Sequence, residues 1–68
     1  MREVRLESPD DEHEFRFELR IKVGDQVNRG DIIAIVETDK AIMEMDAYEA
    51  MRILRITPTR RGYVLEVE

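Results

Sequence analysis

The stretch from Ile32 to Met45 reads I-I-A-I-V-E-T-D-K-A-I-M-E-M, two apolar runs on either side of a polar segment. The first run, Ile32 to Val36, is rich in β-branched residues, which suit a strand buried on both faces. The second run, Ala41 to Met45, is equally short. Because the polar segment Glu37 to Lys40 separates them, the stretch predicts two antiparallel strands joined by a hairpin.

The rest of the chain also has the period of two that indicates strands. Glu14 to Val23 reads E-F-R-F-E-L-R-I-K-V and predicts a half-buried strand with its charges on one face. Gly and Asp residues predict turns at Gly24-Asp25 and at Arg29-Gly30-Asp31. Asp46 to Arg55 is the one stretch for which a helix stays open. Further short strands are expected at Arg2 to Leu6, Met51 to Ile56 and Tyr63 to Val67.

An internal repeat relates the two halves of the chain. Leu19-Arg20-Ile21 recurs as Leu54-Arg55-Ile56, and Arg29-Gly30 with its following apolar run recurs as Arg61-Gly62. The first pair of motifs is 35 positions apart and the second is 32, so the second half has lost three residues. Two similar halves of short strands predict two sheets related by a quasi-twofold axis.

The composition limits the classes of protein to which the chain can belong. Its 68 residues (1–68) are expected to form one small domain. The absence of Cys excludes disulfides and thiolate chemistry, and the single histidine, His13, excludes a multi-histidine metal site. A net charge of −5 disfavours nucleic-acid binding. No apolar run approaches the roughly 18 residues of a membrane span, and no signal-peptide core is evident, so we expect a cytoplasmic or equivalent interior location.

Three short motifs in register resemble a known family. Val23-Gly24-Asp25-Gln26-Val27 precedes Gly30-Asp31-Ile32-Ile33-Ala34, which precedes Val36-Glu37-Thr38-Asp39-Lys40-Ala41. In this order and spacing they resemble the lipoyl domain of the 2-oxo acid dehydrogenase complexes, a member of the biotinyl/lipoyl attachment family. The resemblance is tight from Ile21 to Asp46 and looser elsewhere.

The resemblance implies a fold and a site. The fold would be all-β, a flattened barrel-sandwich of two antiparallel sheets with quasi-twofold symmetry and its termini far from the hairpin. Lys40 would lie at the hairpin tip and carry lipoate as an amide, while Glu37, Thr38, Asp39 and Ala41 would shape the turn and be recognised by the modifying ligase. A hairpin tip suits this role because loop tips protrude, and arginine cannot replace lysine because its guanidinium does not deprotonate.

The resemblance also implies a function and partners. The chain would be a non-catalytic swinging-arm carrier that shuttles acyl groups in a complex such as the pyruvate dehydrogenase complex, either free-standing or as part of a dihydrolipoyl acyltransferase. Its partners would be a lipoyl ligase or transferase, a thiamine-dependent 2-oxo acid decarboxylase, the acyltransferase core and a flavin-dependent dihydrolipoyl dehydrogenase. Neither nucleic acid nor a membrane would be among them.

Two alternatives stay open, a biotin carrier domain and an unmodified barrel-sandwich interaction module. The sister biotin family places Met on both sides of its modified lysine, where this chain has Asp39 and Ala41, so the motif favours lipoate. Glu49-Ala50-Met51-Arg52 resembles a biotin motif, but arginine stands where that motif has lysine. The lipoyl family also has Ala-Pro and then Gly after its hairpin, and Ala47 to Met51 has neither.

Other candidate sites have simpler explanations. Asp10 to Glu14 lacks the ligand spacing and glycine of a calcium loop and suits a solvated turn. A protruding hairpin is expected to offer no cleft in which carboxylates could do acid–base chemistry. Its acidic residues are instead expected either to form a rim that a basic partner recognises or to keep the surface soluble. These residues are Glu37, Asp39, Glu44 and Asp46.

Lys22 is the second lysine and is expected on the polar face of a regular strand, where nothing presents its amine. Phe15 and Phe17 alternate on an apolar face, so they are expected in the core and not as platforms for nucleic-acid bases. Three methionines, Met43, Met45 and Met51, are expected to fill the core.

Overall fold

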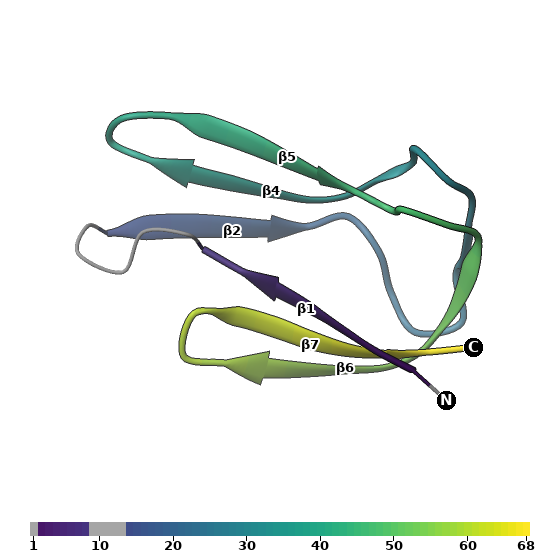
Figure 1. Cartoon of the computed structure of the whole chain (residues 1–68). Coiled ribbons are helices and arrows are strands. Elements are labelled where there is room, and N and C mark those ends of the chain that lie inside the picture. The colour runs from purple at the N-terminus through teal and green to yellow at the C-terminus, as the bar shows by residue number, and fades with distance from the viewer. Residues whose placement is uncertain (1, 9–13) are drawn as a thin grey trace.

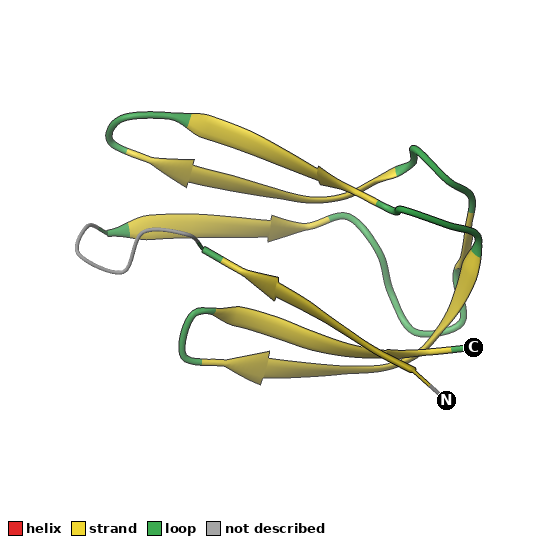
Figure 2. Ribbon diagram, in the orientation of Figure 1, coloured by secondary structure: helices red, strands yellow, loops and turns green. Residues whose placement is uncertain are grey.

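The computed structural model describes residues 2–8 and 14–68, and within these ranges the chain is built of strands and contains no helix (Figure 1, Figure 2). The stretch from Asp46 to Arg55, for which a helix was open, instead ends one strand and begins another. No helix in the described ranges is therefore long and apolar enough to cross a membrane. The strands are β1 (Arg2–Glu7), β2 (Phe15–Leu19), β3 (Gln26–Val27), β4 (Ile32–Thr38), β5 (Ile42–Asp46), β6 (Met51–Thr59) and β7 (Gly62–Val67).

The strands form two antiparallel sheets. One has four strands in the order β1-β7-β6-β3, and the other has three in the order β2-β4-β5. Figure 1 shows the β4–β5 hairpin and the β6–β7 hairpin in separate layers, with their turns at the same end of the molecule. The predicted all-β barrel-sandwich of two antiparallel sheets is confirmed.

The quasi-twofold relation is visible in the strand orders. In one sheet β4 lies between β2 and β5, and in the other β7 lies between β6 and β1. The repeat in the sequence equates β2 with β6 and β4 with β7, so the two sheets match strand for strand except that β3 has no counterpart. The first half makes a long connection between β2 and β4 that includes β3, whereas the second half turns directly at Arg60 and Arg61. The second half is three residues shorter than the first, and the loss falls in the part that corresponds to this connection.

The two Gly-Asp motifs form the same turn. In each, Gly takes a positive φ, +97° at Gly24 and +90° at Gly30, which side-chain-bearing residues rarely adopt. The backbone N–H of Lys22 donates to the Asp25 carboxylate, and the Asp25 N–H donates to the Lys22 carbonyl. Asn28 and Asp31 repeat both bonds. The motifs are therefore type II turns closed by an aspartate.

The core lies between the sheets. Nine hydrophobic residues from both halves form one buried cluster, and Phe17, Tyr63, Met45 and other half-buried side chains pack against it. A register shift between Ile32 and Ala34 turns the consecutive residues Ile33 and Ala34 both inward. The cluster consists of Leu6, Val27, Ile33, Ala34, Ala47, Met51, Ile53, Leu65 and Val67.

Two strand ends differ by three or more residues from those predicted. β2 ends at Leu19, although the Arg20 N–H still donates to the Ile33 carbonyl, and Lys22 and Val23, which continue the alternation, belong to the first type II turn. β6 runs on to Thr59 through Pro58, beyond its predicted end at Ile56. Pro58 is tolerated because it lies beyond the part of β6 that pairs with β3, where no described strand pairs with that side of β6.

Candidate functional site

Lys40 lies in a two-residue turn at the end of the β4–β5 hairpin. The register pairs Glu37 with Ile42, and the Thr38 N–H donates to the Ala41 carbonyl at 2.8 Å, so Asp39 and Lys40 alone form the bend. Both residues are exposed. The amine of Lys40 forms no ion pair with any described residue. The site is therefore a free primary amine on a short, strand-supported bend.

The side chain of Thr38 holds this bend. Its hydroxyl oxygen accepts the backbone N–H of Lys40 at 3.2 Å and that of Ala41 at 3.1 Å. Both bonds satisfy amide groups that the two-residue bend removes from the ladder. No non-glycine residue among those described has a positive φ, so the bend is not of the primed type that hairpins prefer. The two hydrogen bonds to the Thr38 hydroxyl therefore stabilise a bend whose backbone conformation is not the one that hairpins prefer.

The hairpin turn and the chain termini lie at opposite ends of the molecule (Figure 1). The quasi-twofold arrangement explains this, because the β4–β5 turn is the counterpart of the ends of β7 and β1, where the chain stops and starts. A side chain on the turn therefore projects away from whatever is attached to either end of the chain.

Lys22, the other lysine, was predicted on a regular strand, but it does not lie on one. It follows the end of β2 and opens the first type II turn, exposed to solvent. The strand prediction failed because the alternation continues past Leu19 while the backbone already bends toward Asp25. Phe15 at the start of β2 pairs with Thr38 next to the bend, whereas Leu19 at its end pairs with Ala34. Lys22 follows Leu19 and therefore lies at the end of the sheet away from Lys40.

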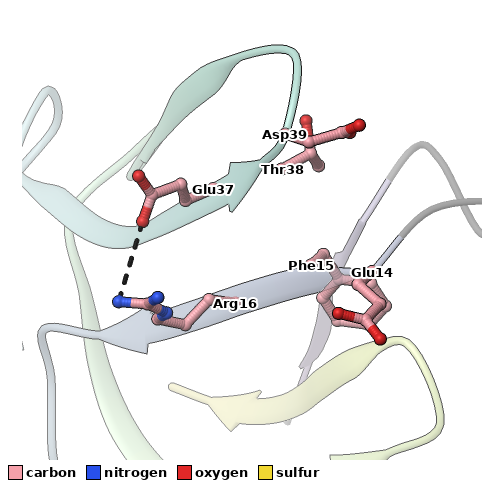
Figure 3. A pocket seen from close by; sticks show the side chains of 6 residues that line it. All are labelled: Glu14, Phe15, Arg16, Glu37, Thr38 and Asp39. Carbon is pink, nitrogen blue, oxygen red and sulfur yellow. Dashed lines mark ion pairs between the residues drawn. The ribbon is translucent and has the colours of Figure 1, made fainter.

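An open hollow of about 330 Å³ lies beside the hairpin, between the start of β2 and the end of β4 (Figure 3). Arg16 and Glu37 approach each other across it, with 3.9 Å between guanidinium nitrogen and carboxylate oxygen. The hollow is open to solvent and is formed because β2 runs alongside this end of β4. The expectation that the hairpin offers no cleft suited to acid–base chemistry stays a prediction. The residues that line the hollow are Glu14, Phe15, Arg16, Glu37, Thr38 and Asp39.

The predicted acidic rim is only partly assembled at the turn. Glu37 and Asp39 lie beside Lys40, but Asp46 pairs with Ile32 at the opposite end of the hairpin. Four strand steps, roughly 13 Å, separate Ile42 from Asp46. Glu44 and Asp46 are therefore spread along β5, away from the turn, and do not gather with Glu37 and Asp39 around Lys40.

One apolar residue near the lysine was missed by the sequence reasoning. Ile42 is 67% exposed, two positions after Lys40. The alternation of β5 carries the signal, because Met43 and Met45 face the core side and Ile42 must then face outward. Among the three methionines expected in the core, Met51 is fully buried and Met45 packs against the core from its edge.

No metal site is found in residues 2–8 and 14–68, where no three His, Asp or Glu side chains lie close enough to share an ion. The acidic segment considered for a cation, Asp10 to Glu14, lies outside the described residues except for Glu14. That prediction therefore stays untested.

The fold and the site together define a class of protein. In the described part of the chain, two small antiparallel sheets without helices place Lys40 on a tight bend, remote from the termini. This is the construction of a domain that carries a covalently attached group. The family model for biotin and lipoyl attachment, described as "Biotin-requiring enzyme", matches residues 6–67. The chain belongs to this family. Its members are non-catalytic carrier domains, so the chain is a carrier and not an enzyme.

Two curated relatives carry the same name. The chain is 53% identical over 36 residues to the dihydrolipoyllysine-residue acetyltransferase component of the pyruvate dehydrogenase complex of Zymomonas mobilis. It is 47% identical over 36 residues to the component of the same name from Rhizobium meliloti. Each alignment covers 53% of this chain but 8% of the relative, so the chain spans a small part of these proteins. No solved structure gives a significant match.

Proposed function

We propose that the chain is a lipoyl carrier domain in which Lys40 holds lipoate through an amide at Nζ. The observation that carries the proposal is the pairing of an exposed, unpaired lysine on a two-residue bend with relatives named for a dihydrolipoyllysine residue. The residues around the bend fit such a group, because no described residue forms an ion pair with the amine and the adjoining residues Asp39 and Ala41 are exposed. When bound, lipoate supplies a dithiolane that accepts and passes on an acyl group.

The chain's own contribution is presentation. A ligase active site must enclose the lysine, and a two-residue bend on paired strands holds the amine out while keeping its backbone fixed. Thr38 fixes the bend, and Glu37 and Asp39 place negative charge beside it. Attachment through a chain end on the opposite side leaves the hairpin free to visit several active sites, and tethering raises its effective concentration at each.

We propose the partners from the same relatives. They are a lipoyl ligase or transferase, and the thiamine-dependent decarboxylase, acyltransferase core and flavin-dependent dehydrogenase of a 2-oxo acid dehydrogenase complex. The hollow at the hairpin base offers a docking partner both signs of charge, from Arg16 and Glu37, next to the phenyl ring of Phe15.

Intact-mass measurement after co-expression tests the attachment. The chain is produced with a lipoyl ligase and lipoate, and separately with a biotin ligase and biotin. We expect the mass of one lipoyl group on the wild type and on Lys22→Arg, and no added mass on Lys40→Arg. The two variants are a matched pair because each removes one exposed lysine and keeps its charge.

The other results decide against the proposal. An adduct with biotin alone identifies a biotin carrier domain, and no adduct with either ligase identifies an unmodified interaction module. An adduct that persists in Lys40→Arg and disappears in Lys22→Arg moves the attachment site to the opposite end of the molecule. Circular dichroism of each variant verifies that its sheets are intact.

A further inference from the structure

Among residues 2–8 and 14–68, no strand lies beside the outer edge of β2. β2 stands at the end of its sheet, and among the described residues β4 is its strand partner. The counterpart of this edge in the other sheet is the outer edge of β6, which β3 covers through Gln26 and Val27. Because the second half lacks the residues equivalent to β3, the matching place beside β2 is empty of a described strand.

Burial shows the consequence of the missing strand. Met51 and Ile53, which point inward from β6 beside β3, are 1% and 0% exposed. The inward residues of β2, Phe15, Phe17 and Leu19, are only half-buried. The β2 side of the core is therefore incompletely covered.

The hydrogen-bonding groups of this edge can be identified from the ladder. The Arg20 N–H donates to the Ile33 carbonyl at 2.9 Å, so Arg20 directs its backbone toward β4. Backbone direction alternates along a strand, and Phe15, Phe17 and Leu19 therefore direct their N–H and C=O groups away from β4. These three residues present the groups that an added strand would bond.

The charges on the outward face of β2 select one partner and one register. From Glu14 to Arg20 they read Glu14, Arg16, Glu18, Arg20. An antiparallel copy centred on Phe17 sets Arg16 opposite Glu18 and Glu14 opposite Arg20. It also sets Phe17 opposite Phe17 of the second copy and Phe15 opposite Leu19. The N–H and C=O groups that point away from β4 can therefore bond to the same groups of the second copy.

The neighbouring registers are unfavourable. Centring the pair on Arg16 or Glu18 places like charges opposite one another at each charged position whose partner also lies between Glu14 and Arg20, which destabilises cross-strand pairs. Sliding one copy of β2 by a single residue would set residues whose backbone groups point away from β4 opposite residues whose backbone groups point toward it, and the two strands could not then form a hydrogen-bonded ladder. The other edge of this sheet, β5, carries Glu44 and Asp46 on its outer face and would repel its own copy.

We propose that the chain associates with a second copy of itself through antiparallel pairing of β2 with β2, centred on Phe17, to form one continuous sheet of six strands. The contact is isologous, because each copy uses the same edge. Lys40 is not part of it, and the two hairpin turns point in opposite directions, since β2 of one copy runs against β2 of the other. The proposal therefore does not depend on lipoate attachment.

Sedimentation equilibrium of the unmodified chain tests the association. Over roughly 10 μM to 1 mM we expect a monomer–dimer equilibrium for the wild type. Arg16→Glu and Glu18→Arg should each weaken it by at least about tenfold, since each change creates two like-charge pairs across the symmetric contact. Arg5→Glu, an equal charge change on the exposed face of β1, is the control and should leave the equilibrium unchanged.

A mixing experiment isolates the register. Arg16→Glu and Glu18→Arg are each poor at self-association, but mixed in equal amounts they restore all four charge pairs and should form a heterodimer close to wild-type strength. The double variant Arg16→Glu/Glu18→Arg should recover self-association for the same reason. Hydrogen exchange should show the Phe17 and Leu19 amides gaining protection as the wild-type concentration rises.

Three results would overturn the proposal. The first is a wild type that stays monomeric up to about 1 mM, a concentration well above the dissociation constants of specific interfaces. The second is a dimer that Arg5→Glu dissociates and Arg16→Glu does not, because the contact would then use β1. The third is two variants that fail to associate when mixed although circular dichroism shows both to be folded.

Discussion

At Gly62, the first residue of β7, the chain has no room for a side chain. A Cβ built at this position would lie 1.9 Å from the Leu6 carbonyl oxygen and 3.0 Å from the Phe17 ring. The obstacle is backbone, which cannot rotate away as a flexible side chain can. Gly62 therefore allows β1 to approach β7 and closes the larger sheet at the same point where Phe17 and Tyr63 stack edge to face.

Gly62→Ala should destabilise the domain by at least about 3 kcal/mol, since the backbone of β1 must move to admit one methyl group. Gly30→Ala is the control, because its Cβ would meet nothing within 4 Å and only the positive φ opposes it. That strain costs about 1 kcal/mol. Urea denaturation of both variants gives the comparison, and equal losses of stability would mean that β1 is free to yield.

At the scale of single elements, the β4–β5 bend depends on one hydroxyl. Thr38→Val keeps the β-branched shape and removes the oxygen that accepts the Lys40 and Ala41 amides. We expect a stability loss of about 1 kcal/mol, typical of lost hydrogen bonds at a partly exposed site. We also expect slower attachment at Lys40, because the amine is then held less firmly.

Thr57→Val provides the control for this prediction, since Thr57 is an exposed threonine of β6 far from the bend in sequence. Attachment is followed as adduct mass against time with limiting ligase. If both variants are modified at the wild-type rate, the Thr38 hydroxyl contributes to folding alone and not to presentation of the lysine.

At the scale of the whole molecule, one small core supports both sheets. A domain of this length has roughly 3–10 kcal/mol of stability, and truncating a fully buried isoleucine to alanine removes about 2–5 kcal/mol. Ile53 is 0% exposed, whereas Ile42 is 67% exposed. Ile53→Ala should therefore unfold a large fraction of the molecules at 37 °C, and Ile42→Ala should change stability by less than about 0.5 kcal/mol.

Urea denaturation followed by circular dichroism and by tyrosine fluorescence measures both isoleucine variants. Coincident transitions are expected, because the buried cluster draws residues from both halves and neither sheet has a core of its own. Separate transitions for the two probes would show that the sheets unfold independently.

The hairpin and its lysine could be predicted from local sequence, because a two-residue bend between apolar strands is decided by neighbouring residues. The same holds for the Gly-Asp turns, where each aspartate bonds a residue three positions earlier. Strand ends were less predictable. Alternation continues through Lys22 although the sheet stops at Leu19, because the end of β2 is set by the long connection that crosses to β6.

The order of residues was sufficient for the strand-forming pattern, the repeat, the shortened second half and the position of Lys40 on the hairpin, since all of these depend on near neighbours and spacing. Folding in three dimensions was needed to place β2 beside β4, which creates the hollow, and to leave the outer edge of β2 without a partner strand among the described residues. These features arise from contacts between residues distant along the chain. Such contacts depend on which sheets pair and close, and local patterns do not encode them.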